Sequence, residues 1–172
     1  MSPGARAPRL VLAALVAASA VALALAFWVQ YGLGYPPCSL CLRARLPHYA
    51  LIAAGGLALW FDRPRAGLTA ALAALFAAVV ISFNHAGVEA GWLEMPGGCV
   101  AQPASGELGE LRSALMAQTR PSCAQPGPTF AGLSMAAWHA VTALGLAVVA
   151  ALALTPPGRG NRPHRRAPAP PR

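Results

Sequence analysis

The chain has 172 residues, of which 56% are hydrophobic and only 10% are charged. Soluble domains carry about 25% charged residues, so this composition argues against an ordinary soluble domain and against a disordered chain. All thirteen basic residues are arginine and only five residues are acidic, which gives a net charge of +8. Such a charge indicates nucleic-acid binding only where the basic residues gather on one face of a soluble fold.

Four apolar segments follow one another, and we expect membrane-crossing helices over about residues 10–30, 42–61, 67–85 and 132–154. About 20 apolar residues in a helix cross a hydrocarbon core of ~30 Å, and backbone groups in lipid must be paired internally. The first segment could be a signal peptide, but its apolar stretch exceeds the usual length of about 7–15 residues. The sequence therefore predicts an all-α, polytopic membrane four-helix bundle, with a single domain over residues 1–155.

The positions of the arginines predict how these helices are oriented. Nine of the thirteen precede the first segment, separate the second from the third, or follow the fourth: Arg6, Arg9, Arg63, Arg65, Arg159, Arg162, Arg165, Arg166 and Arg172. The positive-inside rule makes that side cytoplasmic. Both termini are then cytoplasmic, with a disordered basic tail over 156–172. The loops at about 31–41 and 86–131 are external.

All four cysteines fall on the external side. Cys38 and Cys41 stand where the first loop enters the second helix, and Cys99 and Cys123 lie in the long second loop. An even number of cysteines on an oxidising side indicates disulfides, for which three connectivities are possible. The pairing of Cys38 with Cys41 and of Cys99 with Cys123 is the one that keeps each pair within a loop.

The spacing of the first pair is typical of redox chemistry. A Cys-x-x-Cys bridge closes too short a loop to be a good structural staple, but one thiolate can attack while the other resolves. Haem attachment is excluded because Leu42, and not histidine, follows Cys41. Zinc is disfavoured because Cys99 and Cys123 do not form a second Cys-x-x-Cys, so no metal site is expected.

Two polar residues near this pair are candidates for ligand binding. Arg45 lies four residues after Cys41, which is about one helical turn. Its guanidinium could stabilise a Cys41 thiolate and the anion of a reduced acceptor. Arg43 is better explained by an interaction with lipid headgroups. His85 ends the third segment and could donate a hydrogen bond to a polar ligand, whereas His139 is expected to pack or to lie at the interface.

The second loop also contains a helical pattern. Leu108, Leu111, Leu115 and Met116 are spaced as on one face of a helix, which predicts an amphipathic helix over residues 105–118. Such a helix would lie flat on the membrane surface. It would hold the loop in place while leaving Cys99 and Cys123 accessible.

Three blocks of sequence are the most specific: residues 37–41 followed by 45–47, residues 84–89, and residues 121–123 followed by 130–138. In these blocks the chain closely resembles the disulfide-bond-formation protein B (DsbB) family, and the resemblance extends from the first apolar segment to the fourth. Each block is moderately specific, and their order together with the sidedness of the cysteines makes the match strong. The chain has Ala44 where family members often have glutamine.

The resemblance implies a quinone-dependent thiol oxidase of the bacterial inner membrane. Its cofactor would be ubiquinone or menaquinone, and its partner a periplasmic DsbA-like protein of the thioredoxin type, a route known to keep the periplasm oxidising. It implies that Cys99 forms the mixed disulfide with this partner and that the freed Cys123 attacks Cys38. Cys41 then becomes the thiolate beside the quinone.

The same resemblance implies that Arg45 stabilises the Cys41 thiolate and that His85 assists at a quinone carbonyl. Two other functions are open. A reductase with the opposite electron flow would need a cytoplasmic or intramembrane thiol relay, which the positions of the cysteines do not offer. A non-enzymatic membrane scaffold would use both disulfides only to staple its loops.

Overall fold

The computed structural model describes residues 3–96, 99, 108–109 and 121–155. It is mostly helical, as expected: α1 (Pro3–Phe27) with a π-helical turn η1 (Trp28–Gly32), α2 (Ser39–Trp60), α3 (Pro64–Glu89), β1 (Thr129–Phe130), β2 (Leu133–Ser134) and α5 (Met135–Leu154). Nearly all of the amphipathic helix expected over 105–118, and the whole tail over 156–172, lie outside the described residues.

Three of these helices are long and apolar enough to cross a membrane. They are Arg6–Gly32, which joins α1 to η1, and the helices α3 and α5, with mean hydropathies of 2.7, 2.3 and 2.0. The 22-residue helix α2 is long enough but less apolar, because its first half carries Arg43, Arg45 and His48. Composition alone therefore supports three of the four expected crossings.

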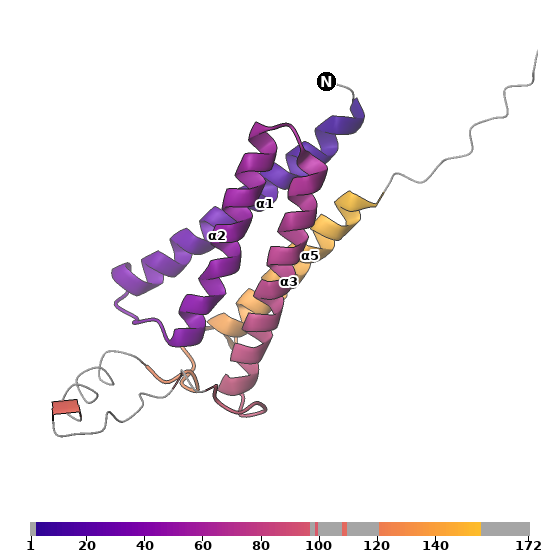
Figure 1. Ribbon diagram of the computed structural model, residues 1–172. Coiled ribbons are helices and arrows are strands. Elements are labelled where there is room, and N and C mark those ends of the chain that lie inside the picture. Colours follow the sequence, from indigo (N-terminus) through magenta and orange to yellow (C-terminus); the bar gives the residue numbers. More distant parts are fainter. Residues whose placement is uncertain (1–2, 97–98, 100–107, 110–120, 156–172) are drawn as a thin grey trace, which may run out of the picture.

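The helices pack around α3, which contacts α1, α2 and α5 (Figure 1). Buried leucines and alanines from all four helices form one apolar core: Leu12, Leu15, Leu51, Leu68, Ala71, Leu75, Ala147 and Ala150. A second buried cluster lies at the opposite end of the helices and contains Cys38, Cys99 and Cys123, with the half-buried Cys41 packed against it. The apolar core therefore fixes the helices at one end and leaves the cysteine end for chemistry.

The chain begins and ends its described course at the end away from the cysteines (Figure 1). There the guanidinium of Arg9 contacts the carboxylate of Asp62 at 2.6 Å, which joins the start of α1 to the turn between α2 and α3. Arg63 and Arg65 lie in and just after the same turn. Arginines from two of the three expected clusters thus share one end of the molecule.

The boundaries of α2 and α3 differ from those expected. α2 begins at Ser39, and not near 42, because Cys38 caps it, so Cys41 lies within the helix and not in a loop. Pro47 lies inside α2. α3 runs from Pro64, a residue suited to the first position of a helix, to Glu89, so that His85 lies inside the helix and not at its end.

The helices at the two ends of the chain also differ. α1 begins at Pro3, seven residues before the expected start, and continues through η1. The stretch before α5, expected to be helical from 132, is instead a small hairpin in which β1 pairs with β2. Ala131 and Gly132 have φ values of 49° and 80°, as a type I′ turn requires. α5 begins only after Ser134, whose hydroxyl accepts a hydrogen bond from the amide of Ala137.

Candidate redox site

The first cysteine pair is built into the beginning of α2. Cys38 is the N-cap residue, and its sulfur accepts a hydrogen bond from the amide of Cys41 at 3.2 Å. The sulfur of Cys41 lies within hydrogen-bond distance of the same sulfur, at 2.8 Å, and Nε2 of His85 lies 3.5 Å from it. The positive end of a helix favours a negative charge at this position. All of these contacts therefore converge on the sulfur of Cys38.

These contacts make Cys38 the acidic member of the reduced pair. The hydrogen bond from the Cys41 thiol lowers the pKa of Cys38 most, and burial opposes it. The hydrogen bond from His85 lowers it further, and the pKa falls from 9.0 to about 4. When both cysteines are reduced, the thiolate therefore rests on Cys38 at neutral pH, with Cys41 as its hydrogen-bond donor.

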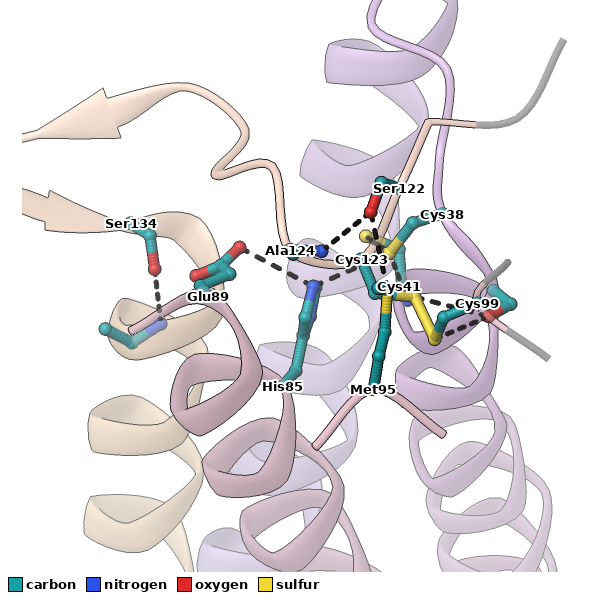
Figure 2. A network of polar contacts seen from close by, with 12 residues as sticks. Cys38, Cys41, His85, Glu89, Met95, Cys99, Ser122, Cys123, Ala124 and Ser134 are labelled. Atoms are coloured by element: carbon teal, nitrogen blue, oxygen red, sulfur yellow. Dashed lines mark hydrogen bonds and ion pairs between the residues drawn. A yellow bond between two sulfur atoms is a disulfide. The ribbon is translucent and has the colours of Figure 1, made fainter. Parts of the chain in front are cut away.

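The second pair forms a disulfide that packs against the first. Cys99 and Cys123 are bonded, and Cys38 and Cys41 are free thiols, so the expected pairing is confirmed for the loop cysteines. The hydroxyl of Ser39 lies 3.2 Å from the sulfur of Cys99 and 3.4 Å from that of Cys123. Figure 2 shows the two pairs side by side.

α3 brings a histidine and a carboxylate to the pair. Nε2 of His85 lies 3.5 Å from Oε1 of Glu89, and both side chains are only 7% exposed. The other carboxylate oxygen, Oε2, is buried and has no hydrogen-bond partner among the described residues. Figure 2 shows His85 between Glu89 and the cysteines. Glu89 was not singled out from the sequence, although its spacing of four residues from His85 was visible there.

The side chain of Arg45 is buried, unlike that of Arg43. Its guanidinium lies over the ring of Phe27, 4.8 Å from the centroid, and Nη2 donates to the carbonyl of Ala26 at 3.5 Å. Among the described residues, its contacts are therefore with α1 and not with the sulfur of Cys41. Arg45 and Cys41 nevertheless line the same cavity.

This cavity has a volume of about 490 Å³ and opens between α1, α2, α3 and α5 beside the cysteines. Its polar lining includes Cys41, Arg45, His85, Glu89 and Gln30, and the buried Oε1 of Gln30 has no partner among the described residues. Much of the remaining wall is apolar, with Ala22, Leu25, Ala26, Val29, Ala136 and Trp138 among its residues. Pockets of this size, with few polar groups in an apolar wall, suit small organic ligands.

A family model described as "Disulfide bond formation protein DsbB" matches residues 8–153 of the chain. The chain belongs to the DsbB family. No curated protein and no solved structure matches it. The resemblance inferred from the three sequence blocks is thus confirmed. Membership in the DsbB family, together with the apolar helices, indicates a multi-pass inner-membrane protein of disulfide formation and a disulfide oxidoreductase.

This DsbB-family protein also has a row of hydrogen-bonded polar side chains between its helices, which its sequence did not reveal. Nδ1 of His48 lies 3.2 Å from the hydroxyl of Ser19, and Nε2 lies 2.7 Å from Nε2 of His139. Nδ1 of His139 lies 2.5 Å from the hydroxyl of Ser82, which donates to the carbonyl of Ala78. α1, α2, α5 and α3 thus each contribute one side chain. His139, expected to pack or to lie at the interface, is a hydrogen-bonding member of this row.

The direction of these hydrogen bonds follows from the last of them. Because the Ser82 hydroxyl donates to a carbonyl, its oxygen accepts from Nδ1 of His139. Nε2 of His139 then accepts from Nε2 of His48, whose Nδ1 accepts from Ser19. Every hydrogen in this assignment is used once with both imidazoles neutral. Every imidazole nitrogen in this row therefore has a hydrogen-bond partner. Both histidines also line the cavity.

Proposed function

We propose that this DsbB-family protein is a protein-thiol:quinone oxidoreductase that reoxidises a periplasmic DsbA-like partner. Electrons pass through the two cysteine pairs to a membrane quinone. The observation that carries this proposal is that one buried cluster holds both pairs beside a cavity of about 490 Å³. Thiol–disulfide exchange requires a thiolate to reach a sulfur of the next bond, which such a cluster favours.

The loop disulfide receives the electrons first. A thiolate of the reduced partner attacks Cys99, which forms a mixed disulfide and releases Cys123 as a thiolate. Cys123 then attacks Cys38 in the oxidised first pair and releases Cys41 as a thiolate. The Ser39 hydroxyl, 3.2 and 3.4 Å from the sulfurs of Cys99 and Cys123, can donate to whichever of them becomes charged.

The second half of the exchange restores the loop pair. The partner's other thiolate attacks its own sulfur in the mixed disulfide, which oxidises the partner and releases Cys99. Cys99 attacks Cys123 and releases Cys38, whose pKa of about 4 makes it a good leaving group. Two electrons then reside on the Cys38 and Cys41 thiols. This is the oxidation state in the structure, with Cys99 and Cys123 bonded.

The residues around the cavity fit a quinone. A bound quinone would accept two electrons from the thiol pair and restore its disulfide. Arg45 and His85 supply donors for carbonyl oxygens, and the unpartnered oxygens of Gln30 and Glu89 supply acceptors for the hydroxyls of the reduced form. The apolar wall suits the ring and tail. Arg45 is thus the cation that would stabilise the anion of the reduced acceptor. Cys41 is the cysteine nearest to Arg45 in the sequence.

The proposal includes the orientation of the protein. Residues 1–155 form a single four-helix transmembrane domain, with periplasmic cysteines, cytoplasmic termini and a basic cytoplasmic tail over 156–172. The contact between Arg9 and Asp62 supports this orientation, because it joins two arginine-bearing segments at one end. α2 crosses with Arg45 and His48 buried against the other helices, whereas Arg43 is exposed.

Turnover by purified protein in lipid nanodiscs tests this function. We expect quinone-dependent oxidation of a reduced thioredoxin-like partner and its loss in Cys41→Ser. Arg45→Ala should raise the KM for quinone at least about tenfold, because it removes a buried charge-assisted donor. Arg43→Ala is the matched control, since Arg43 is exposed two residues away. Full turnover in Cys41→Ser would contradict the route, and a scaffold would show no turnover in any variant.

A further inference from the structure

Three metal-binding side chains meet where α2 begins. The sulfurs of Cys38 and Cys41 and the imidazole of His85 place one donor atom each within 4.8 Å of one another. A fourth donor stands beside them, because Oε1 of Glu89 lies 3.5 Å from Nε2 of His85. Oε2 of Glu89 is buried with no hydrogen-bond partner in the described part of the chain. A buried carboxylate with an unpartnered oxygen is able to take a further partner, and a cation is one that suits its chemistry.

We propose that the reduced Cys38–Cys41 pair is a binding site for a thiophilic divalent cation, zinc in particular, with His85 and Glu89 as the other ligands. The site was not expected from the sequence, which shows only one Cys-x-x-Cys. The second half of the ligand set comes from α3, which lies more than forty residues further along the chain. Two thiolates with an imidazole form a soft donor set that selects zinc over magnesium or calcium.

Two of the distances between these ligand atoms fit a tetrahedral ion. Zinc lies about 2.3 Å from sulfur, about 2.0–2.1 Å from nitrogen and about 2.0–2.2 Å from oxygen. Tetrahedral angles then separate sulfur from nitrogen by about 3.5 Å and nitrogen from oxygen by about 3.4 Å. The corresponding distances here are 3.5 Å from Cys38 to His85 and 3.5 Å from His85 to Glu89.

The two sulfurs and the Glu89 carboxylate have to move, because Glu89 is not among the side chains whose donor atoms all lie within 4.8 Å of one another. The sulfurs lie 2.8 Å apart, and tetrahedral zinc would separate them by about 3.8 Å. Two thiolates repel each other, so this opening is the direction that full deprotonation of the pair favours. The ion's two positive charges would balance those of the two thiolates.

Zinc binding and oxidation of this pair exclude each other. Zinc binds cysteine as the thiolate, and the sulfurs of a disulfide carry no negative charge, so only the dithiol form of the pair binds the ion. Resting on the proposed function, this makes zinc a reversible inhibitor that traps the enzyme after it has accepted electrons from its partner. Removal of the ion by a chelator restores the thiols and turnover.

Cobalt(II) is the probe that tests the site directly. The reduced protein, with Cys99→Ser and Cys123→Ser to remove the other thiols, should bind one cobalt ion per chain. We expect tetrahedral ligand-field bands and thiolate-to-cobalt charge transfer, both lost on addition of zinc, and no signal from the oxidised protein. Glu89→Gln should weaken binding at least about tenfold. Glu94→Gln, at an exposed carboxylate, is the matched control.

His85 is tested in two ways, because its side chain is buried and one variant could fail to fold. His85→Asn should weaken cobalt binding at least about tenfold, and His85→Cys should restore it with additional charge transfer from a third thiolate. Absence of the bands in the reduced protein that carries Cys99→Ser and Cys123→Ser would overturn the proposed ligand set. Undiminished cobalt affinity in His85→Asn or Glu89→Gln would overturn it as well. These measurements use neither quinone nor partner. Failed turnover with intact cobalt binding therefore refutes the proposed function alone.

Discussion

At the scale of single residues, the start of a helix decides which of two neighbouring cysteines carries the charge. Cys38 has the extended backbone of an N-cap residue, with φ −72° and ψ 174°, and receives the amide of Cys41. Cys41 is already inside the helix and donates a hydrogen bond to the charged form of Cys38. Two cysteines separated by two residues therefore have different chemistry because the helix begins between them.

The acidity of Cys38 gives a first prediction. In the reduced protein, the ultraviolet absorbance of the Cys38 thiolate should persist at neutral pH and disappear with a midpoint near pH 4. A lowered pKa means that the charged form is lost only as the pH falls through that value. Cys41→Ala should raise the midpoint most, because it removes the strongest donor, and His85→Asn should raise it less. A midpoint above pH 7 in the unaltered protein would contradict this description.

At the scale of helices, the hydrogen bond between α2 and α5 belongs to a row of side chains to which all four helices contribute. His48 and His139 satisfy each other at 2.7 Å, and Ser19 and Ser82 satisfy their remaining nitrogens. Loss of one partner leaves a buried imidazole nitrogen without a bond, which costs about 1–3 kcal/mol. Replacement of both by apolar groups removes that penalty.

A double-mutant cycle tests this link. His48→Leu and His139→Leu should each lower the free energy of unfolding by about 1–3 kcal/mol. The double variant should lose less than their sum, with a coupling of about 0.5 kcal/mol or more. The measurement is unfolding in detergent, followed by a signal that does not depend on thiols. Thr69→Ala, at an exposed residue far from the pair, is the control, and its effect should add to that of either histidine variant. Strict additivity of the two histidine variants would show that they do not interact.

Close packing of α1 against α2 gives a second prediction at this scale. A Cβ added at Gly55 would lie 2.7 Å from Cγ2 of Val16, whereas one at Gly56 would meet nothing within 4 Å. Gly55→Ala should therefore lower the unfolding temperature. Gly56→Ala should leave it unchanged or raise it, because alanine favours a helix over glycine by about 1 kcal/mol. Equal effects of the two neighbouring substitutions would contradict this packing.

The helices were predictable from local pattern, but several of their ends were not. α2 was expected to begin near residue 42 because its start was set by the length of the apolar run, whereas the cap at Cys38 is of a residue type not common at that position. The hairpin before α5 was missed because Phe130 and Leu133 continue the apolar run of the helix, and only the backbone conformation separates them.

The candidate site divides in the same way. Cys38, Cys41 and Arg45 could be found from their spacing along one segment, and His85 from its place at the end of the third apolar run. The pairing of His48 with His139 could not, because 91 residues separate them and only the packing of α2 against α5 brings them together. The place of Glu89 beside His85 also depended on α3 extending past its apolar stretch.

At the scale of the whole molecule, the positions of the arginines underlie the proposed orientation of the protein in the membrane. Those near the start of α1 and in the turn before α3 lie at one end, and the cysteines lie at the other. In a cysteine-free background, a membrane-impermeant maleimide added from the periplasmic side should label Trp92→Cys and not Arg65→Cys. Both positions are exposed. The reverse labelling would contradict the proposed orientation.

The central claim is that electrons leave the protein from Cys38 and Cys41 to a membrane quinone. Thiol trapping in membranes with and without quinone tests it most directly, because the redox state of each pair is read without purified partner. On quinone depletion, we expect Cys38 and Cys41 to accumulate as thiols and to return to the disulfide when quinone is restored. Cysteines that all remain oxidised in quinone-depleted membranes would contradict the claim and favour a scaffold.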